Sequence, residues 1–307
     1  MPKSRNRIVV GVVALVLGLT ACHSEPTPPP QSPTPTARPD WPKKLSDFRF
    51  RWSAEPGFEL TTGQAVPLRA YLESRLIVAY TDDVAAAYPG FERATPIPLE
   101  PGAPELMEIP YALREIRMPR GPSKFDDPNQ RIVGNEELHV LRTEPTPVGF
   151  RALVCDATFN TYKQAAGEGH YVPIMSYPGF RPTDYENMKV WRIELSDRDA
   201  RATSAPPASP NKPQSGPLPA PRTDVFGPWF VTGAIGVAGW SDSDYPDLLQ
   251  GTPEQQQRFR EAQDAEAAMR QQCLDRYPLN AEQRKAIATT VIDAPPAVKP
   301  ALPGWPE

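Results

Sequence analysis

Histidine and serine side chains could catalyse hydrolysis, and this chain has only three histidines: His23, His139 and His170. A histidine base needs a nucleophile within hydrogen-bond reach. No serine lies in the G-x-S-x-G pattern that presents a nucleophile in many hydrolases. A hydrolase or isomerase site holding His139 or His170 beside Asp156 is the alternative to a non-catalytic chain. We assign no catalytic residue from the sequence.

Spaced carboxylates and glycines raise the question of a metal or nucleotide site. Asp242, Asp244 and Asp247 could bind calcium, but an EF-hand loop requires glycine at its sixth position, where Asp247 stands. The glycines of residues 233–239 follow G-x-x-G-x-x-G, which differs from the dinucleotide fingerprint G-x-G-x-x-G. An acidic surface loop and a tightly packed strand end are the simpler interpretations. We expect no metal and no cofactor.

The first 21 residues have the composition of an export signal. Lys3, Arg5 and Arg7 precede a 12-residue uncharged run over residues 8–19. A membrane-spanning helix needs about 20 apolar residues, whereas the apolar part of a secretory signal has roughly 7–15. The pattern therefore predicts a signal peptide over residues 1–21, with a transmembrane anchor as the alternative.

The residues that end this signal are Leu19-Thr20-Ala21-Cys22. They resemble the lipobox of bacterial lipoproteins of the actinobacterial type. The resemblance implies cleavage after Ala21 and diacylation of Cys22, which would anchor the protein at the extracytoplasmic face of the cell membrane. Two acyl chains hold a domain at a bilayer stably, whereas one chain does so only marginally.

If Cys22 carries lipid, only Cys155 and Cys273 remain, and they allow one pairing. Disulfide bonds persist in the oxidising space that an exported protein occupies. We therefore expect a disulfide bond between Cys155 and Cys273, with two buried free thiols as the alternative. The cysteine spacing fits no C-x-x-C metal site.

Proline dominates three segments of a chain that has 41 prolines in 307 residues. Residues 22–42 read as a Pro/Thr-rich tether that could reach about 60 Å in polyproline conformation. Residues 200–222 have seven prolines and almost no core formers, and we expect a disordered loop there. Residues 294–307 read as a proline-rich tail. A single α+β domain is expected between them, over residues 43–293.

The charge balance excludes one class of partner. The chain has 33 basic and 37 acidic residues, and its net charge of −4 lacks the basic excess of proteins that bind nucleic acid. After cleavage, 30 basic and 37 acidic residues would remain, a net charge of −7. The acyl chains, rather than attraction to anionic lipid, would therefore hold the protein at the membrane.

Apolar periodicity and capping residues predict three helices. The apolar spacing favours a helix over residues 64–87. A second helix should begin after Thr252, where Thr252 and Gln255 form a capping box, and should run to about Asp275 with Cys273 facing the core. Asn280 and Gln283 should cap a short helix over residues 281–290.

Segments rich in β-branched and aromatic residues predict strands over residues 137–143, 149–159 and 189–195, and another early in 225–240. In the third segment Trp191, Ile193 and Leu195 should point inward. This series looks like the strands of exported NTF2-like lipoprotein domains. That resemblance implies an α+β fold in which a curved antiparallel sheet wraps a helix in a cone, with a pocket that Tyr162, Trp191 and Trp229 could line.

These features together favour one function. We expect a membrane-anchored cell-envelope lipoprotein that binds a protein, wall polymer or small apolar ligand without catalysis, and that binds no nucleic acid. The sequence itself identifies neither the ligand nor the partner.

Overall fold

A computed structural model of the chain describes nine stretches of sequence. They are residues 41–96, 111–114, 116–117, 130–165, 169–177, 181, 183–198, 207–236 and 252–307. The predicted signal peptide, Cys22 and residues 22–40 of the tether lie outside them, as do Asp242, Asp244 and Asp247. The described residues all belong to one compact unit.

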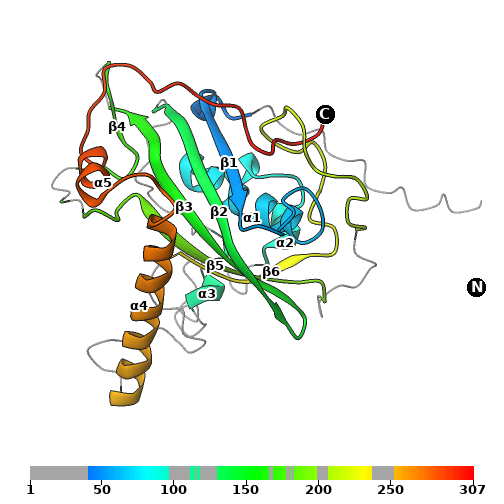
Figure 1. The fold of residues 1–307 in the computed structure, drawn as a ribbon. Helices are drawn as coiled ribbons and strands as arrows, with labels where there is room; N and C mark the ends of the chain where they lie inside the picture. The colour runs from blue at the N-terminus through cyan, green and yellow to red at the C-terminus, as the bar shows by residue number, and fades with distance from the viewer. Residues whose placement is uncertain are drawn as a thin grey trace, which may run out of the picture. The chain divides into compact units, whose positions relative to one another are not determined.

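A six-stranded mixed sheet forms the centre of this unit (Figure 1). The strands are β1 (Phe48–Ala54), β2 (Ile132–Thr146), β3 (Gly149–Gln164), β4 (Tyr171–Pro173), β5 (Met188–Ser196) and β6 (Phe230–Ile235). Their order is β1-β2-β3-β5-β6, and β4 pairs with the end of β3. The predicted α+β class is confirmed. All pairs are antiparallel except β1 with β2, which are parallel and are joined by the long crossover that such a pair requires.

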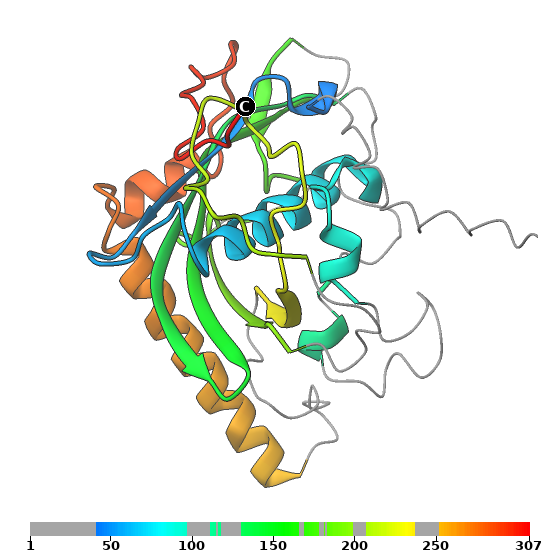
Figure 2. The same ribbon diagram turned by 90° about the vertical axis from the view of Figure 1, so that its right-hand side faces the viewer.

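Local irregularities bend the two longest strands. The pairing of β2 with β3 shifts register between Asn135 and Glu137 and again between Val140 and Arg142. Such bulges bend a strand and increase its twist. Gly134, with φ of 101°, passes so close to Asn160 that a Cβ atom would lie 1.9 Å from its carbonyl oxygen. Figure 2 shows β2 and β3 curving around the long helix of the concave side.

That helix is α1 (Ala65–Thr81), and nearly all of its residues are buried. It ends at Asp82, which has φ of 53° and donates its N–H to the Val78 carbonyl at 2.8 Å. The predicted helix over 64–87 was therefore too long, since Val84–Ala86 form a separate 3-10 turn, η2.

The other long helix, α4 (Pro253–Leu274), lies on the opposite side of the sheet. The remaining helices are short: η1 (Lys43–Leu45), α2 (Phe91–Ala94), α3 (Tyr111–Arg114) and α5 (Ala281–Ile287). Both predicted capping boxes are confirmed, Thr252 with Gln255 and Asn280 with Gln283. Among the described helices, none has both the length and the apolar composition needed to cross a membrane.

Both faces of the sheet carry buried apolar clusters. On the concave face, Trp191, Ile193 and Leu195 point into the main core, as predicted. On the other face, Val190 and Cys155 belong to a second apolar cluster that the end of α4 covers. The fold therefore has a layer of α1 and its neighbours, the sheet, and then α4.

The proline-rich segment predicted to be disordered is ordered over residues 207–222. The Gln214 N–H donates to the Thr61 carbonyl at 2.7 Å, and Leu218 exchanges backbone hydrogen bonds with Trp305. The backbone groups of this segment thus form hydrogen bonds although the segment belongs to no helix or strand. Composition predicted disorder here because it cannot report such distant partners.

The proline-rich tail was also assigned wrongly, because it is part of the core. Trp305 is only 1% exposed and packs with the main cluster. The Leu302 carbonyl accepts a hydrogen bond from the Trp52 N–H, which extends the edge of the sheet beyond β1. The folded domain therefore extends to residue 307 rather than 293.

Candidate functional site

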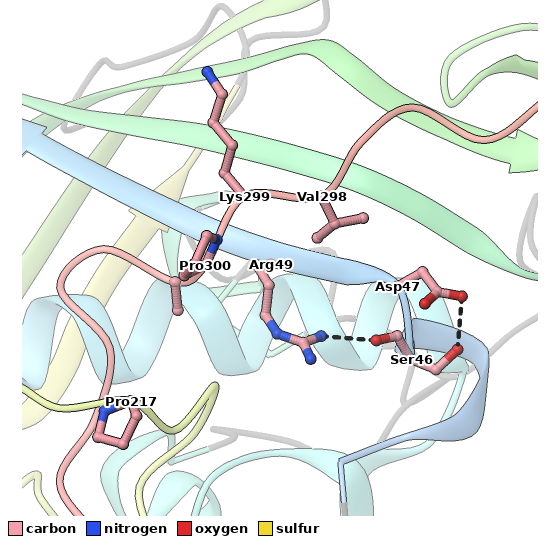
Figure 3. Close-up of a pocket in the computed structure, with 8 residues that line it drawn as sticks. Ser46, Asp47, Arg49, Pro217, Val298, Lys299 and Pro300 are labelled. Atoms are coloured by element: carbon pink, nitrogen blue, oxygen red, sulfur yellow. Dashed lines mark hydrogen bonds between the residues drawn. The ribbon is translucent and has the colours of Figure 1, made fainter.

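An open groove of about 340 Å³ lies where three distant segments meet. Its lining comes from Ser46, Asp47 and Arg49 at the start of β1, from Pro217 in the ordered proline-rich segment, and from residues 298–301 of the tail. Figure 3 shows the tail passing beside β1, and the Arg49 side chain extending from β1 toward Ser46. The segment predicted to be disordered and the proline-rich tail thus form two of the three walls.

Arg49 is the half-buried cation of this groove. Its Nη1 donates to the Ser46 carbonyl at 2.9 Å and to the Phe48 carbonyl at 2.6 Å, and its guanidinium lies 5.6 Å from the centre of the Trp41 ring. Burial lowers the pKa of Arg49, while the nearby Asp47 charge opposes this. The guanidinium remains a cation at neutral pH because the ordinary pKa of arginine is above 12.

Asp47, the one carboxylate in the lining, already has partners. It forms an ion pair with Arg131 and accepts a hydrogen bond from the Ser46 hydroxyl at 3.2 Å. Lys299 is exposed at the rim. The cations at the groove therefore exceed the single anion, although the chain as a whole is acidic.

A second polar cluster lies inside the fold, between α1 and the concave face of the sheet. Glu136 and Asp156 are both buried there, with 0% and 3% exposure. Glu136 Oε2 accepts a hydrogen bond from the Tyr80 hydroxyl at 2.6 Å, and Asp156 Oδ2 accepts one from the Trp191 indole at 2.9 Å. Glu136 Oε1 and Asp156 Oδ1 have no such partner within the described part of the chain.

Protonation of Glu136 would allow this pair to share one proton. Two ionised carboxylates repel each other and cannot hydrogen-bond, whereas an acid and a carboxylate can. Burial raises the pKa of Glu136 well above its ordinary value, and the charge and hydrogen bond of Asp156 raise it further. The pair could in principle transfer a proton, but the groove does not reach it.

We expect the Glu136→Gln variant to gain stability relative to the native protein as pH rises. A carboxyl group whose pKa is raised by folding contributes stability below its unfolded pKa, and this contribution is lost as pH rises toward its folded pKa. The loss begins near pH 4.5, the ordinary value, and can reach about 1.4 kcal/mol per pH unit. Urea unfolding from pH 4 to pH 8 measures it.

The exposed carboxylate Asp264, changed to Asn, is the matched control, and its stability difference from the native protein should not follow this trend. A stability difference for Glu136→Gln that stays constant over the same range would contradict a shared proton.

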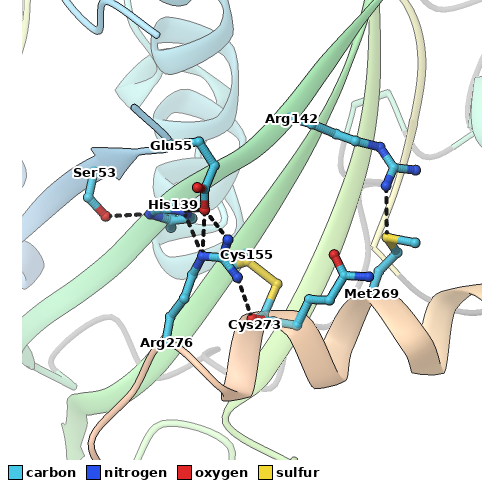
Figure 4. The surroundings of a disulfide bond; sticks show 9 residues. Ser53, Glu55, His139, Arg142, Cys155, Met269, Cys273 and Arg276 are labelled. Atoms are coloured by element: carbon cyan, nitrogen blue, oxygen red, sulfur yellow. Dashed lines mark hydrogen bonds and ion pairs between the residues drawn. A yellow bond between two sulfur atoms is a disulfide. The ribbon is translucent and has the colours of Figure 1, made fainter. Parts of the chain in front are cut away.

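A third cluster lies on the opposite face of the sheet, next to α4 (Figure 4). Ser53 and His139 are direct partners in the parallel pairing of β1 with β2. Ser53 Oγ lies 2.8 Å from His139 Nδ1, and His139 Nε2 lies 3.1 Å from Glu55 Oε1. The hydroxyl, imidazole and carboxylate thus follow one another as in a nucleophilic triad.

Arg276, just after α4, changes the electrostatics of this triad. Its Nε donates to Glu55 Oε1 at 2.7 Å and to His139 Nε2 at 3.1 Å. Burial and then the Arg276 charge lower the pKa of His139, while Glu55 opposes them. Nδ1 accepts the Ser53 proton only in the tautomer that carries a hydrogen on Nε2, and in that tautomer Nε2 cannot also accept a hydrogen bond from Arg276.

The disulfide bond lies beside this network. Cys155 on β3 and Cys273 on α4 are joined, with Cα atoms 5.6 Å apart, so the predicted pairing is confirmed and the alternative of two free thiols is not. The bond attaches the end of α4 to the centre of the sheet (Figure 4).

The predicted partners of Asp156 are not brought to it. His139 pairs with Cys155, whereas Asp156 pairs with Leu138, so His139 and Asp156 lie on opposite faces of the sheet. His170 lies just before β4, beside the end of β3. The part of β3 between Asp156 and that end is roughly 25 Å long. The predicted combination of these residues was wrong. The sequence did not single out Ser53, on the strand that pairs with His139, or Glu55, which follows the end of that strand.

The three aromatic residues predicted to line one pocket do not share one. Trp191 and Trp229 belong to the main core, and Trp229 packs edge-on against Phe150. Tyr162 belongs instead to a small cluster with Tyr171 near β4. No group of three or more metal-binding side chains occurs within the described ranges.

Arg69 and Glu73, both on α1, form a buried polar centre. Glu73 accepts hydrogen bonds from Trp52 (2.7 Å), Tyr88 (2.5 Å) and Trp305 (2.9 Å). Burial raises the pKa of Glu73, and Arg69 and the three donors oppose this. Arg69 donates to four carbonyl groups, those of Leu60, Gln214, Pro303 and Gly304. This centre fastens the proline-rich segments to α1.

Comparisons with known proteins found no match for this chain among protein-family models, curated proteins or solved structures. The functional argument therefore rests on the residues and their geometry.

Proposed function

We propose that this protein is a cell-envelope lipoprotein, held at the extracytoplasmic face of the membrane by acylated Cys22, whose domain binds an envelope partner without catalysis. The partner is an envelope protein or a wall component. The groove at Arg49 is the observation that carries the binding part of the proposal, because it is open, polar and built on ordered walls.

Two further observations support the proposal. The pattern of residues 1–22 provides the anchor. The bond between Cys155 and Cys273 suits an exported protein, since disulfides persist in oxidising compartments and are rare in reducing ones. The described domain begins at Trp41, beside Arg49, so the predicted tether would join the domain close to the groove.

We expect the Cys22→Ser variant to leave the membrane fraction and to lose labelling by an alkyne palmitate analogue, because removing the thiol removes both acyl chains. Ser24→Ala is the matched control and should stay in the membrane fraction with its label. Cross-linking of the Cys22→Ser and Ser24→Ala variants in cells should then enrich an envelope partner only with Ser24→Ala, which keeps the anchor. A Cys22→Ser variant that remains membrane-bound would contradict lipid anchoring.

An envelope hydrolase is the second candidate, and the chain of hydrogen bonds from Ser53 through His139 to Glu55 favours it. Its test is labelling with a fluorophosphonate probe, which reacts with activated serines. Labelling that is lost in Ser53→Ala and in His139→Gln, but kept in Ser46→Ala, would establish a reactive serine. Absence of labelling would support the non-catalytic function.

A further inference from the structure

We propose that the Arg49 groove binds a single oxyanion, a carboxylate or phosphate, carried by a unit of a wall polymer. This inference rests on the proposed binding function and specifies its ligand. Arg49 would hold two oxygens of the anion with the edge of its guanidinium formed by Nε and Nη2.

The orientation of Arg49 is fixed before any ligand arrives. Two backbone carbonyls, those of Ser46 and Phe48, hold Nη1, and the Trp41 ring packs against the guanidinium. Within the described residues, Nε and Nη2 have no hydrogen-bond partner. This edge presents two parallel N–H groups, the arrangement that matches two oxygens of a carboxylate or phosphate.

The wall opposite Arg49 is also rigid. The buried Asn135 side chain accepts from the Lys299 N–H at 2.8 Å and donates to the Lys299 carbonyl at 2.9 Å. Arg51 donates to the Pro300 carbonyl at 2.6 Å. Three hydrogen bonds therefore fix the tail backbone, so a ligand would not have to order it, and less conformational entropy would be lost on binding.

Charge and size define the ligand. The lining has two cations, Arg49 and Lys299, and one carboxylate, Asp47, which Arg131 neutralises, so the groove attracts anions on an otherwise acidic protein. Figure 3 shows the Lys299 ammonium directed away from Arg49, so it contributes long-range attraction rather than a fixed contact. A volume of about 340 Å³ lies at the lower end of small-molecule sites. It suits one acidic sugar unit better than a protein surface.

Isothermal titration of the mature lipoprotein in detergent tests the proposal. The probes are glucuronate and polygalacturonate for the carboxylate source, glycerol 3-phosphate and poly(glycerol phosphate) for the phosphate source, and glucose and dextran as neutral controls. At least one anionic pair should bind, with the polymer as tight as its monomer or tighter, and the neutral probes should not. Binding of monomers alone would overturn the assignment to a polymer.

Arg49→Gln should weaken anion binding by about tenfold or more, because it loses charge-assisted hydrogen bonds. Arg49→Lys should recover only part of the lost affinity, since lysine lacks the planar edge of the guanidinium. Arg260→Gln, an exposed position on α4, is the matched control. If the Arg49→Gln variant does not fold, the exposed Lys299→Glu variant tests the proposal instead. Its affinity for the anion should fall at least about threefold, because the new carboxylate repels the anion.

Unchanged affinity in the Arg49 variants, or equal binding of dextran, would overturn the proposal. If no anion binds while cross-linking still captures an envelope protein through the anchored form, the ligand class is wrong and the binding function stands. If both fail, the binding function fails as well.

Discussion

The Trp305→Ala variant is expected to lose about 3–5 kcal/mol of unfolding free energy, which is the usual range for removing a buried tryptophan. The indole is 1% exposed, lies 4.2 Å beneath the Arg69 guanidinium, and donates to Glu73 at 2.9 Å. Its removal leaves a cavity and also takes one of three donors from a buried carboxylate. The loss is large for a position in a segment whose composition suggested a loose tail.

Urea unfolding of the mature protein measures this effect. Trp305→Phe separates its two causes, since phenylalanine fills most of the volume but cannot donate to Glu73, and it should lose about 1–3 kcal/mol. Val291→Ala, at a position 54% exposed, is the control and should change stability by less than about 0.5 kcal/mol. A Trp305→Ala variant as stable as this control would show that the tail is not part of the core.

Removing the disulfide bond is expected to cost about 4–5 kcal/mol. Cys155 and Cys273 are 118 residues apart in sequence, and cross-links that close loops of this length restrict the unfolded chain most. The double variant Cys155→Ala, Cys273→Ala is the appropriate change. Alanine adds no polar group to the apolar cluster in which both sulfurs are buried.

Guanidinium unfolding with and without dithiothreitol measures this loss. The native protein should become less stable in the reductant, whereas the double variant should be insensitive to it. An unfolding free energy for the double variant within about 1 kcal/mol of the oxidised native protein would contradict a stabilising cross-link between α4 and β3.

The elements that the sequence predicted well are those with a local signal. The helix after Thr252 has its capping box and the strand ending at Leu195 has its alternation, and both were found. β1 was not predicted, because it has no β-branched residue, although Phe48, Phe50 and Trp52 alternate there. Its signal was present in the sequence.

The groove and the polar clusters could not be predicted in the same way. Ser53 and His139 meet only through the parallel pairing of β1 with β2, a register that no local pattern specifies. The groove joins residues near 47, 217 and 299, and two of its three segments have a composition typical of disorder. A proline-rich segment can still be ordered when distant partners such as Arg69 bind its carbonyl groups.

The position of Trp305 imposes an order of events on folding. The core around Glu73 combines residues 52, 73, 88 and 305, so it needs contacts between parts of the chain more than 200 residues apart. Contacts of such separation form late, because the intervening chain must first be brought together. If the chain is exported as proposed, the domain cannot complete this core until residue 305 has crossed the membrane. The emerging chain would then remain open to extracytoplasmic chaperones and proteases for nearly the whole of its translocation.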